Sequence, residues 1–228
     1  VNLHIPPGCM LAVVGENGSG KTTLIKLLMR LLEPSSGRIT LDGTPLSEWK
    51  RERLYERFGV VFQDFMRYQF KAGENIGVGD DRYFADETRW RRAARLSTGD
   101  AVIEQLPAAY HSMLGRRFDD GSELSGGQWQ RIALARAFMR SGADIIILDE
   151  PTSMVDARAE REIFKRIEAE LKDQTIIFLS HRFANVRMAD RIIVLDEGKL
   201  TESGTHAELM RLDGRYAQLF EMQARGYQ

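Results

Sequence analysis

The segment Gly15-Glu16-Asn17-Gly18-Ser19-Gly20-Lys21-Thr22 limits the possible folds of this 228-residue chain more than any other feature. It satisfies the pattern G-x-x-x-x-G-K-[ST] in full, with an apolar run before it and a helical pattern after it. Glycines let such a loop curl, so that its backbone N–H groups and the start of the following helix face phosphate oxygens. The sequence therefore predicts a phosphate-binding loop between a buried strand and a helix.

This loop predicts the chemistry of its ligand, ATP with Mg²⁺. We expect Lys21 to reach the β- and γ-phosphates and the Thr22 hydroxyl to ligate Mg²⁺. Thr23 is expected on the side of the α-phosphate. The remaining nucleotide-binding positions are expected to act through their backbone, and they are Gly15, Asn17, Gly18, Ser19 and Gly20.

Two adjacent acids follow a second apolar run. The residues Ile145 to Leu148 lead into Asp149-Glu150, and ligands of open α/β sheets bind at such carboxyl ends of strands. Neighbouring residues of an extended chain point in different directions. We therefore assign Asp149 to the metal and Glu150 to polarising the attacking water, as a general base. The similar "LDEG" at 195–198 is interpreted as a solvated turn.

Strands that are apolar on both faces alternate with helices, which predicts a mainly parallel sheet covered by helices. A small antiparallel hairpin is expected around Asp42-Gly43, and a helix beginning at Ser47. Between residues 65 and 140 the strand-like runs vanish and helical periodicity takes over. The prediction is one domain whose α/β core, 1–64 and 141–228, is interrupted by a helical subdomain at 65–140.

Composition excludes several classes of protein. The net charge of −1 gives no reason to expect nucleic acid as a partner, and we interpret "RWRRAAR" (89–95) as a solvated helix face. Cys9 is the one cysteine, which excludes an internal disulfide and fits a reducing compartment. Apolar runs stay far below the ~20 residues that span a bilayer. The chain starts at Val1, in a strand-like "VNLHI", and is expected to be cut from a longer protein.

The pentapeptide Leu124-Ser125-Gly126-Gly127-Gln128 opens a helix but carries no base, metal ligand or strong nucleophile. A serine cap followed by two glycines leaves backbone N–H donors accessible, which makes a second anion site. The alternative is that Ser125 simply caps a core helix and the glycines allow close packing.

With the pentapeptide lying between the phosphate-binding loop and Ile145–Thr152, the chain resembles the nucleotide-binding domain of ATP-binding cassette (ABC) transporters. The resemblance covers nearly the whole chain and implies a P-loop NTPase, RecA-like core. It implies that Ser125, Gly126, Gly127 and Gln128 contact the γ-phosphate held by a second such domain. Two domains would then enclose two ATP molecules head to tail, as a homodimer or a heterodimer.

The resemblance also assigns single residues. Gln63, after "GVVF", matches the glutamine that senses the metal and the attacking water and links to the membrane partner. His181 in "LSHR" matches the histidine that contacts the γ-phosphate, although alone it would be interpreted as a structural histidine. Asp156 matches the acid at the dimer seam. "GTHAEL" (204–209) resembles the usual closing segment.

Three departures from the family pattern stand out. Met154-Val155 replaces the commoner Ala-Leu, and Phe118-Asp119-Asp120-Gly121 lacks the first glycine of the exporter pattern Gly-Glu-Arg/Lys-Gly. The aromatic residue that stacks on adenine would lie before Val1, so weakened nucleotide affinity is expected. The aromatic loop Phe65, Tyr68 and Phe70 is either core filler or part of the groove that receives a membrane domain.

The sequence thus predicts an ATPase that powers export, at the cytoplasmic face of the cell membrane, with a transmembrane domain as partner and no nucleic acid. One alternative is a soluble cassette ATPase of DNA repair or translation. Such proteins usually have paired cassettes, long coiled-coil inserts or zinc cysteines, and this sequence shows none of them. The other alternative is a regulatory module without turnover, against which Glu150 and His181 argue.

Overall fold

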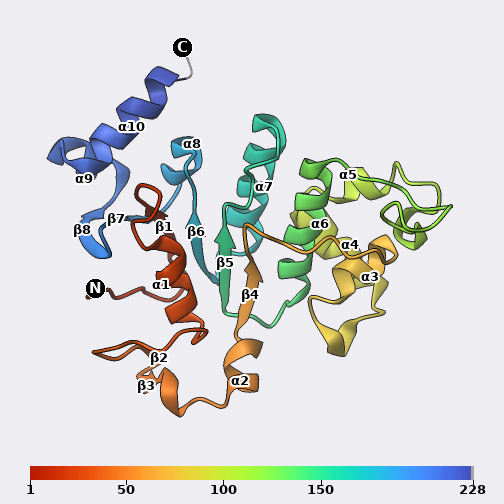
Figure 1. The fold of residues 1–228 in the computed structure, drawn as a ribbon, viewed down its shortest axis with the longest axis horizontal. Helices are drawn as coiled ribbons and strands as arrows, with labels where there is room; N and C mark the ends of the chain where they lie inside the picture. Colours follow the sequence, from red (N-terminus) through yellow and green to blue (C-terminus); the bar gives the residue numbers. More distant parts are fainter. Residues whose placement is uncertain (227–228) are drawn as a thin grey trace. The chain divides into compact units, whose positions relative to one another are not determined.

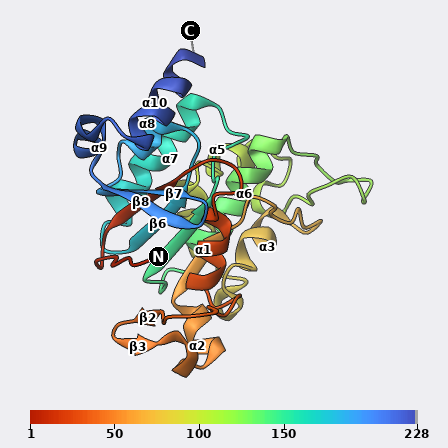
Figure 2. The same ribbon diagram turned by 60° about the vertical axis from the view of Figure 1, so that its left-hand side comes forward.

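The computed structural model, drawn as a ribbon in Figures 1 and 2, describes residues 1–226. The chain divides into two compact units. Unit 1 comprises Val1–Phe58 and Asp173–Gln228, and unit 2 comprises Gly59–Lys172. Each unit is described by itself.

Unit 1 is built on a sheet whose central strand carries the phosphate-binding loop. The strand β1 (Met10–Val14) pairs in parallel with β6 (Thr175–Leu179) on one side and with β7 (Arg191–Asp196) on the other. All five residues of β1 are buried, which explains why this strand reads as an uninterrupted apolar run. The parallel ladders bring the loop after β1 and the loop after β6 to the same edge of the sheet.

The strand β8 (Lys199–Gly204) pairs antiparallel with β7 across a two-residue turn. The turn residues Glu197 and Gly198 have φ values of 47° and 75°, the left-handed geometry that tight hairpins require. The interpretation of "LDEG" as a solvated turn is therefore confirmed. The strand itself was not predicted, because its mostly polar residues are half-buried at best.

The remaining elements of unit 1 include the predicted hairpin, β2 (Thr40–Leu41) and β3 (Thr44–Pro45), which turns at Asp42-Gly43. Four α-helices of this unit flank or follow the strands, and two short helical segments lie between β3 and β4. These elements are α1 (Lys21–Leu28), η1 (Leu46–Glu48), α2 (Arg51–Glu56), α8 (Phe183–Val186), α9 (His206–Leu212) and α10 (Arg215–Gly226).

Two local predictions in unit 1 are wrong. Residues 1–5 form no strand, and Pro6 and Pro7, which lack N–H donors, belong to the turn that leads into β1. The helix predicted from Ser47 is broken, because Trp49 and Lys50 have extended backbones and α2 begins only at Arg51. The Trp49 carbonyl accepts a hydrogen bond from Arg30 Nη1 at 2.9 Å, which holds the break.

Unit 2 contains β4 (Phe58–Val61, with its first residue in unit 1) next to β5 (Ile145–Asp149), and between them a run of helices. Its core holds Trp129, Ile132 and Leu134 of α6, all at most 2% exposed. The helices of this unit are α3 (Ala72–Gly77), η2 (Asp81–Tyr83), α4 (Glu87–Leu96), α5 (Asp100–Ile103), η3 (Ala109–His111), α6 (Gly126–Met139) and α7 (Ala157–Glu170).

The helix α3 was not predicted, because its sequence AGENIG contains two glycines. Packing explains it: a Cβ at Gly73 would lie 2.4 Å from the Trp90 ring, so only glycine lets the two helices approach so closely. Among the described helices, none combines the length and the apolar character that crossing a membrane requires.

Candidate functional site: a phosphate-binding loop and two acidic and glycine-lined loops

The phosphate-binding loop requires its glycines for two different reasons. A Cβ at Gly15 would lie 2.3 Å from the Leu195 carbonyl oxygen of β7, so this position allows no side chain. Gly18 and Gly20 have φ values of 82° and 99°, where other residues are strained. Gly20 also forms the N-cap of α1, which directs the start of that helix at the loop.

Lys21 is 8% exposed, and its ammonium donates to the carbonyl oxygens of Gly15 and Glu16, both at 2.8 Å. The loop is therefore held in a closed curl by its own lysine. The Ser19 hydroxyl is buried and makes no hydrogen bond with the rest of the described chain, whereas Thr22 and Thr23 are exposed at the helix start. A buried hydroxyl without a partner and a cation at a helix N-terminus fit a bound phosphate.

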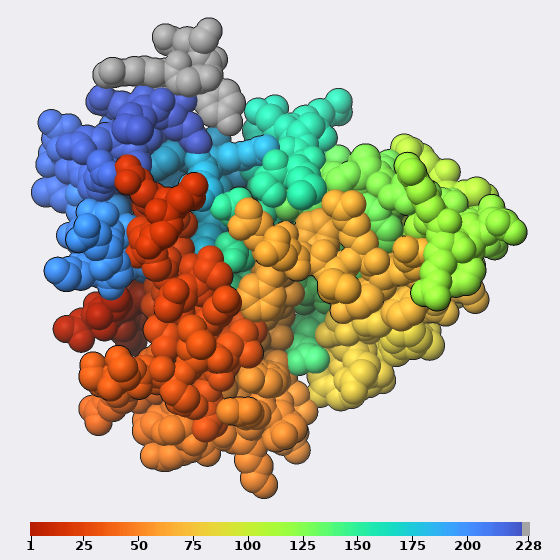
Figure 3. Space-filling model, in the orientation of Figure 1, coloured from red at the N-terminus to blue at the C-terminus, as the bar shows by residue number. Residues whose placement is uncertain are grey.

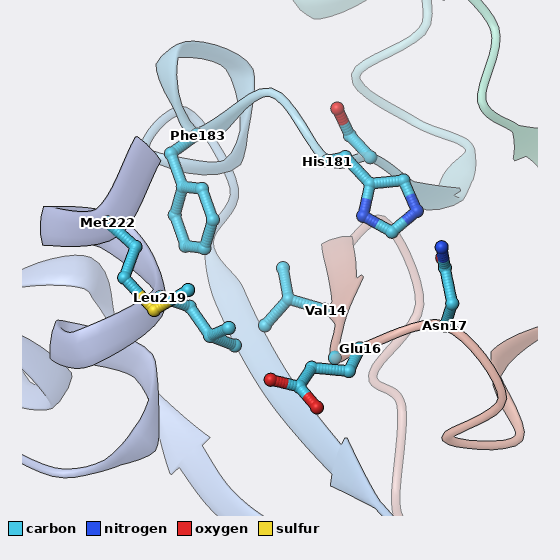
Figure 4. A pocket seen from close by; sticks show the side chains of 9 residues that line it. Val14, Glu16, Asn17, His181, Phe183, Leu219 and Met222 are labelled. Carbon is cyan, nitrogen blue, oxygen red and sulfur yellow. The ribbon is translucent and has the colours of Figure 1, made fainter. Parts of the chain in front are cut away.

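A pocket of about 400 Å³ lies beside this loop, and all of its lining residues belong to unit 1. His181, which is exposed in the loop after β6, lies on one side of it together with Asn17 (Figure 4). The other side is apolar and consists of Phe183, Leu219 and Met222 (Figure 4). The predicted residues Asn17 and His181, which are 164 positions apart in the sequence, thus line the same pocket.

In unit 2, Asp149 is the last residue of β5 and is 4% exposed, while Glu150 is partly accessible. Glu150 has a φ of 50°, an uncommon conformation for a residue other than glycine, and such strain is often found at functional sites. The backbone thus turns sharply at Glu150 and does not stay extended as predicted, and the two acids differ in burial, while their separate roles stay a prediction.

Sequence reasoning missed Gln130, which holds the loop after β5. Its Nε2 donates to the Glu150 carbonyl at 2.9 Å and to Ser153 Oγ at 3.1 Å, and its Oε1 accepts from the Met154 N–H at 2.8 Å. The side chain is 1% exposed and lies on α6. The helix that begins with the pentapeptide therefore fixes the loop that carries Glu150.

The pentapeptide caps α6 through both of its polar side chains. Ser125 Oγ accepts from the Gln128 N–H at 3.3 Å, and Gln128 Oε1 accepts from the Ser125 N–H at 2.8 Å. This reciprocal capping leaves the helix start exposed at Ser125. A Cβ at Gly127 would lie 2.5 Å from the Met154 carbonyl, so close packing is one reason for this glycine.

Asp156 caps α7 and accepts from the N–H groups of Ala159 at 2.9 Å and Arg158 at 3.1 Å. The hydrogen bond from Ala159 is the main reason that the pKa of Asp156 lies below its usual value. Its other oxygen pairs with Arg131 of α6 at 3.1 Å. Gln63 is exposed, two residues after the end of β4.

The aromatic loop after Gln63 is at the surface of unit 2. Tyr68 and Phe70 stack with ring centroids 5.6 Å apart, and Phe70 is 42% exposed, which excludes a purely core-filling role. Arg136 lies 4.5 Å above the Tyr68 ring and donates to the carbonyls of Met66 and Asn75, both at 3.0 Å. Burial lowers the pKa of Arg136 to about 10, which leaves it charged at neutral pH.

Other surface features agree with the sequence analysis. Three of the four arginines of "RWRRAAR" form ion pairs within unit 2, Arg89 with Asp86, Arg91 with Glu87 and Arg95 with Glu170. The segment 116–120, just before the pentapeptide, is exposed and projects from this unit (Figure 3, light green).

Within residues 1–226, no group of three or more His, Cys, Asp or Glu side chains is arranged to hold a metal ion by itself. Mg²⁺ that arrives with a nucleotide does not need such a group, because phosphate oxygens and water complete its shell around one or two protein ligands. Thr22 and Asp149 are donors of the kind this ion prefers.

Comparison with known proteins identifies the family, because the protein-family model described as "ABC transporter" matches residues 1–153. The chain belongs to the ABC transporter family. It is 41% identical over 224 residues to an ATP-dependent lipid A-core flippase of Ralstonia nicotianae, covering 98% of this chain and 37% of that protein. It is 39% identical to the subtilin transport ATP-binding protein of Bacillus subtilis, covering 97% and 36%.

The solved structure of a bacterial Atm1-family ABC exporter with ATP bound superposes with a TM-score of 0.89 at 34% identity. The superposition covers 96% of this chain and 37% of the exporter chain. The ABC chain described here thus spans little more than a third of these relatives. The predicted family, the ATP-binding domain and its mainly parallel α/β fold are confirmed.

Proposed function

We propose that this ABC domain binds ATP with Mg²⁺, hydrolyses it and thereby powers export across a membrane. The observation that carries the proposal is the intact phosphate-binding loop with its lysine curled against Gly15 and Glu16. The three relatives named above are described as ATP-dependent, as an ATP-binding transport protein or as an exporter with ATP bound, which supports the same activity. The soluble cassette ATPase is the less favoured alternative.

The proposed mechanism follows from the chemistry of the side chains. Gly15, Asn17, Gly18, Ser19 and Gly20 surround the phosphates with backbone donors, Lys21 and His181 stabilise negative charge on the γ-phosphate, and Thr23 lies at the α-phosphate. Thr22, Gln63 and Asp149 would hold Mg²⁺, which would neutralise charge on the phosphate oxygens. Glu150 orients the attacking water and accepts its proton.

We further propose that Ser125, Gly126, Gly127 and Gln128 contact the γ-phosphate held by a second nucleotide-binding domain, with Asp156 at the seam between them. The exposed position of Ser125 at the start of α6 supports this role, because the first N–H groups of a helix and the positive end of its dipole favour an anion there. The domain partner is either identical or a related chain.

The transmembrane partner is proposed to contact the surface formed by Met66, Tyr68 and Phe70, which is apolar, partly exposed and held by Arg136. This surface follows Gln63 directly, so a movement of the partner would reach the residue proposed to bind the metal. Such a partner places the domain at the cytoplasmic face of the membrane, and no nucleic acid is involved. The helical segment 65–140 is proposed to act as a subdomain inserted into the core formed by 1–64 and 141–228.

Steady-state release of phosphate from ATP tests the activity. We expect Lys21→Ala and Glu150→Gln to lower kcat at least about a hundredfold, because each removes a group that acts on the reacting phosphate or water. The matched control is Glu197→Gln, which neutralises a glutamate of nearly the same backbone conformation, with a φ of 47°, in an exposed turn. Equal rates in Glu150→Gln and the unmodified protein would favour a regulatory module without turnover.

A further inference from the structure

One face of the C-terminal helix α10 borders the proposed phosphate site. Arg215, Leu219, Met222 and Gln223 lie at spacings of four, seven and eight residues, which places them on the same side of the helix. Leu219 and Met222 line the pocket that also contains Asn17 and His181 (Figure 4). Nothing in the proposed mechanism has used this helix.

Gln223 connects α10 to the loop that carries His181. Its Oε1 accepts a hydrogen bond from the Phe183 N–H at 2.8 Å, and its Nε2 donates to the His181 carbonyl oxygen. A single amide therefore binds the backbone on both sides of Arg182. The Ser180 hydroxyl holds the same turn from within, accepting from the Arg182 N–H at 2.9 Å.

The helix that presents Gln223 is itself fixed to unit 1. The Glu202 carboxylate of β8 accepts from the N–H groups of Arg215 and Tyr216, which anchors the start of the helix. Tyr216 is fully buried, and the Phe183 ring lies 5.4 Å from its ring and 5.7 Å from that of Phe220. Gln223 is thus held by a packed element rather than by a free chain end.

The same helix also reaches the phosphate-binding loop, because the Arg215 guanidinium pairs with the Glu16 carboxylate. One helix therefore contacts both loops whose residues are proposed to face the γ-phosphate. The His181 side chain is exposed, and its imidazole is attached to the backbone segment that Gln223 holds, so a shift of this backbone would move the imidazole with it.

We propose that Gln223 is a positioning residue for ATP hydrolysis, which holds the His181 backbone so that the imidazole meets the γ-phosphate. This inference rests on the proposed function. In a purely stabilising role, Gln223 would only attach α10 to the rest of unit 1. Kinetic measurements separate this role from the positioning of His181.

The kinetic test is a double-mutant cycle in the complete protein, with Gln223→Ala and His181→Ala singly and together. We expect Gln223→Ala alone to lower kcat about threefold to tenfold with KM changed less than about twofold. In the His181→Ala background the same change should lower kcat by less than about twofold, because its effect passes through His181. The matched control is Gln218→Ala, an exposed glutamine of the same helix.

A second measurement is hydrogen exchange of the Phe183 amide, which needs no turnover. Gln223→Ala should speed this exchange at least about tenfold, because the acceptor is lost. Gln223→Glu keeps an acceptor for that amide but loses the donor to the His181 carbonyl, so its exchange should stay near that of the unmodified protein while kcat still falls.

The outcomes are separable. A kcat of Gln223→Ala equal to that of the unmodified protein, or effects that multiply in the double variant, would overturn the positioning role. Unchanged Phe183 exchange in Gln223→Ala would overturn the hydrogen bond on which it depends. If the unmodified protein hydrolyses no more ATP than Lys21→Ala, the proposed function fails instead, and the exchange measurement still decides whether Gln223 holds the loop.

Discussion

At the scale of single residues, the loops proposed to act on ATP are held by amide side chains that belong to other elements. Gln130 bonds three groups of the loop after β5, and Gln223 bonds two groups of the loop after β6. An amide carries both a donor and an acceptor, so it can hold two backbone groups without adding charge next to a polyphosphate.

Substitution of Gln130 tests this arrangement. Gln130→Leu keeps the side-chain volume but removes the donor to the Glu150 carbonyl and the acceptor of the Met154 N–H. We expect the free energy of unfolding to fall by about 2 kcal/mol and kcat to fall at least about tenfold, since Glu150 loses its strained backbone position. Urea denaturation and phosphate release measure the two effects. An unchanged kcat would show that Glu150 keeps its place without Gln130.

These residues also show where prediction from sequence ends. Gly15 to Thr22 could be proposed because phosphate binding requires those residue types at fixed spacing, Asp149-Glu150 because the pair follows an apolar strand, and Ser125 to Gln128 through the family resemblance. Gln130 and Gln223 lie on helices where any polar residue is tolerated by the local pattern. Only the folded chain shows that each meets a loop 20 to 42 residues away in sequence.

At the scale of elements, the apolar strands and long helices were predicted because one residue pattern dictates each of them. The elements that were missed or misplaced depend on contacts between distant segments. β8 is polar and exists through its pairing with β7, and α3 exists because Gly73 fits under the Trp90 ring. The break before α2 follows from the bond between Arg30 and the Trp49 carbonyl.

The packing of α9 against α10 gives a prediction about pH. His206 Nδ1 lies 2.8 Å from the Tyr216 hydroxyl, and burial, aided by Arg187, lowers the pKa of His206. His206 therefore binds a proton more readily in the unfolded chain than in the folded one. The contribution of His206 to the free energy of unfolding is lost as the pH falls below the usual histidine pKa of about 6.5. We expect the drop in Tm between pH 7.5 and 5.5 to be smaller in His206→Asn than in the unmodified protein.

Circular dichroism at the two pH values measures this difference, and titration of the other histidines cancels in the comparison. His111→Asn serves as the control, because that histidine is exposed at the surface of unit 2. Equal pH dependence in His206→Asn and the unmodified protein would contradict the link between His206 and the stability of these helices.

At the scale of the whole molecule, each compact unit carries only part of the proposed machinery. The phosphate-binding loop and His181 belong to unit 1, whereas Gln63, Ser125, Asp149, Glu150 and Asp156 belong to unit 2. Sequence motifs and the family resemblance predicted these residues, and the limits of the compact units fall after Phe58 and after Lys172. Neither limit coincides with a change in composition.

The proposed pairing of two domains gives a test by size-exclusion chromatography. We expect Glu150→Gln with ATP and Mg²⁺ to elute as a dimer, because slow hydrolysis preserves the nucleotide that joins the two copies. Adding Ser125→Asp should return it to a monomer, since an aspartate at this helix start would face the γ-phosphate with like charge. Ser36→Asp, in an exposed loop, is the control. A dimer that survives Ser125→Asp would contradict contact through the pentapeptide.

The polar strand β8 affects whether such domains associate with one another at high concentration. It closes one edge of the sheet, its outward positions are Lys199, Thr201 and Ser203, and the ladder to β7 is irregular at Val194-Leu195. Charged side chains and irregular pairing at an edge strand disfavour β-pairing between molecules. At high concentration, copies of this domain should therefore not assemble into fibrils by pairing through β8.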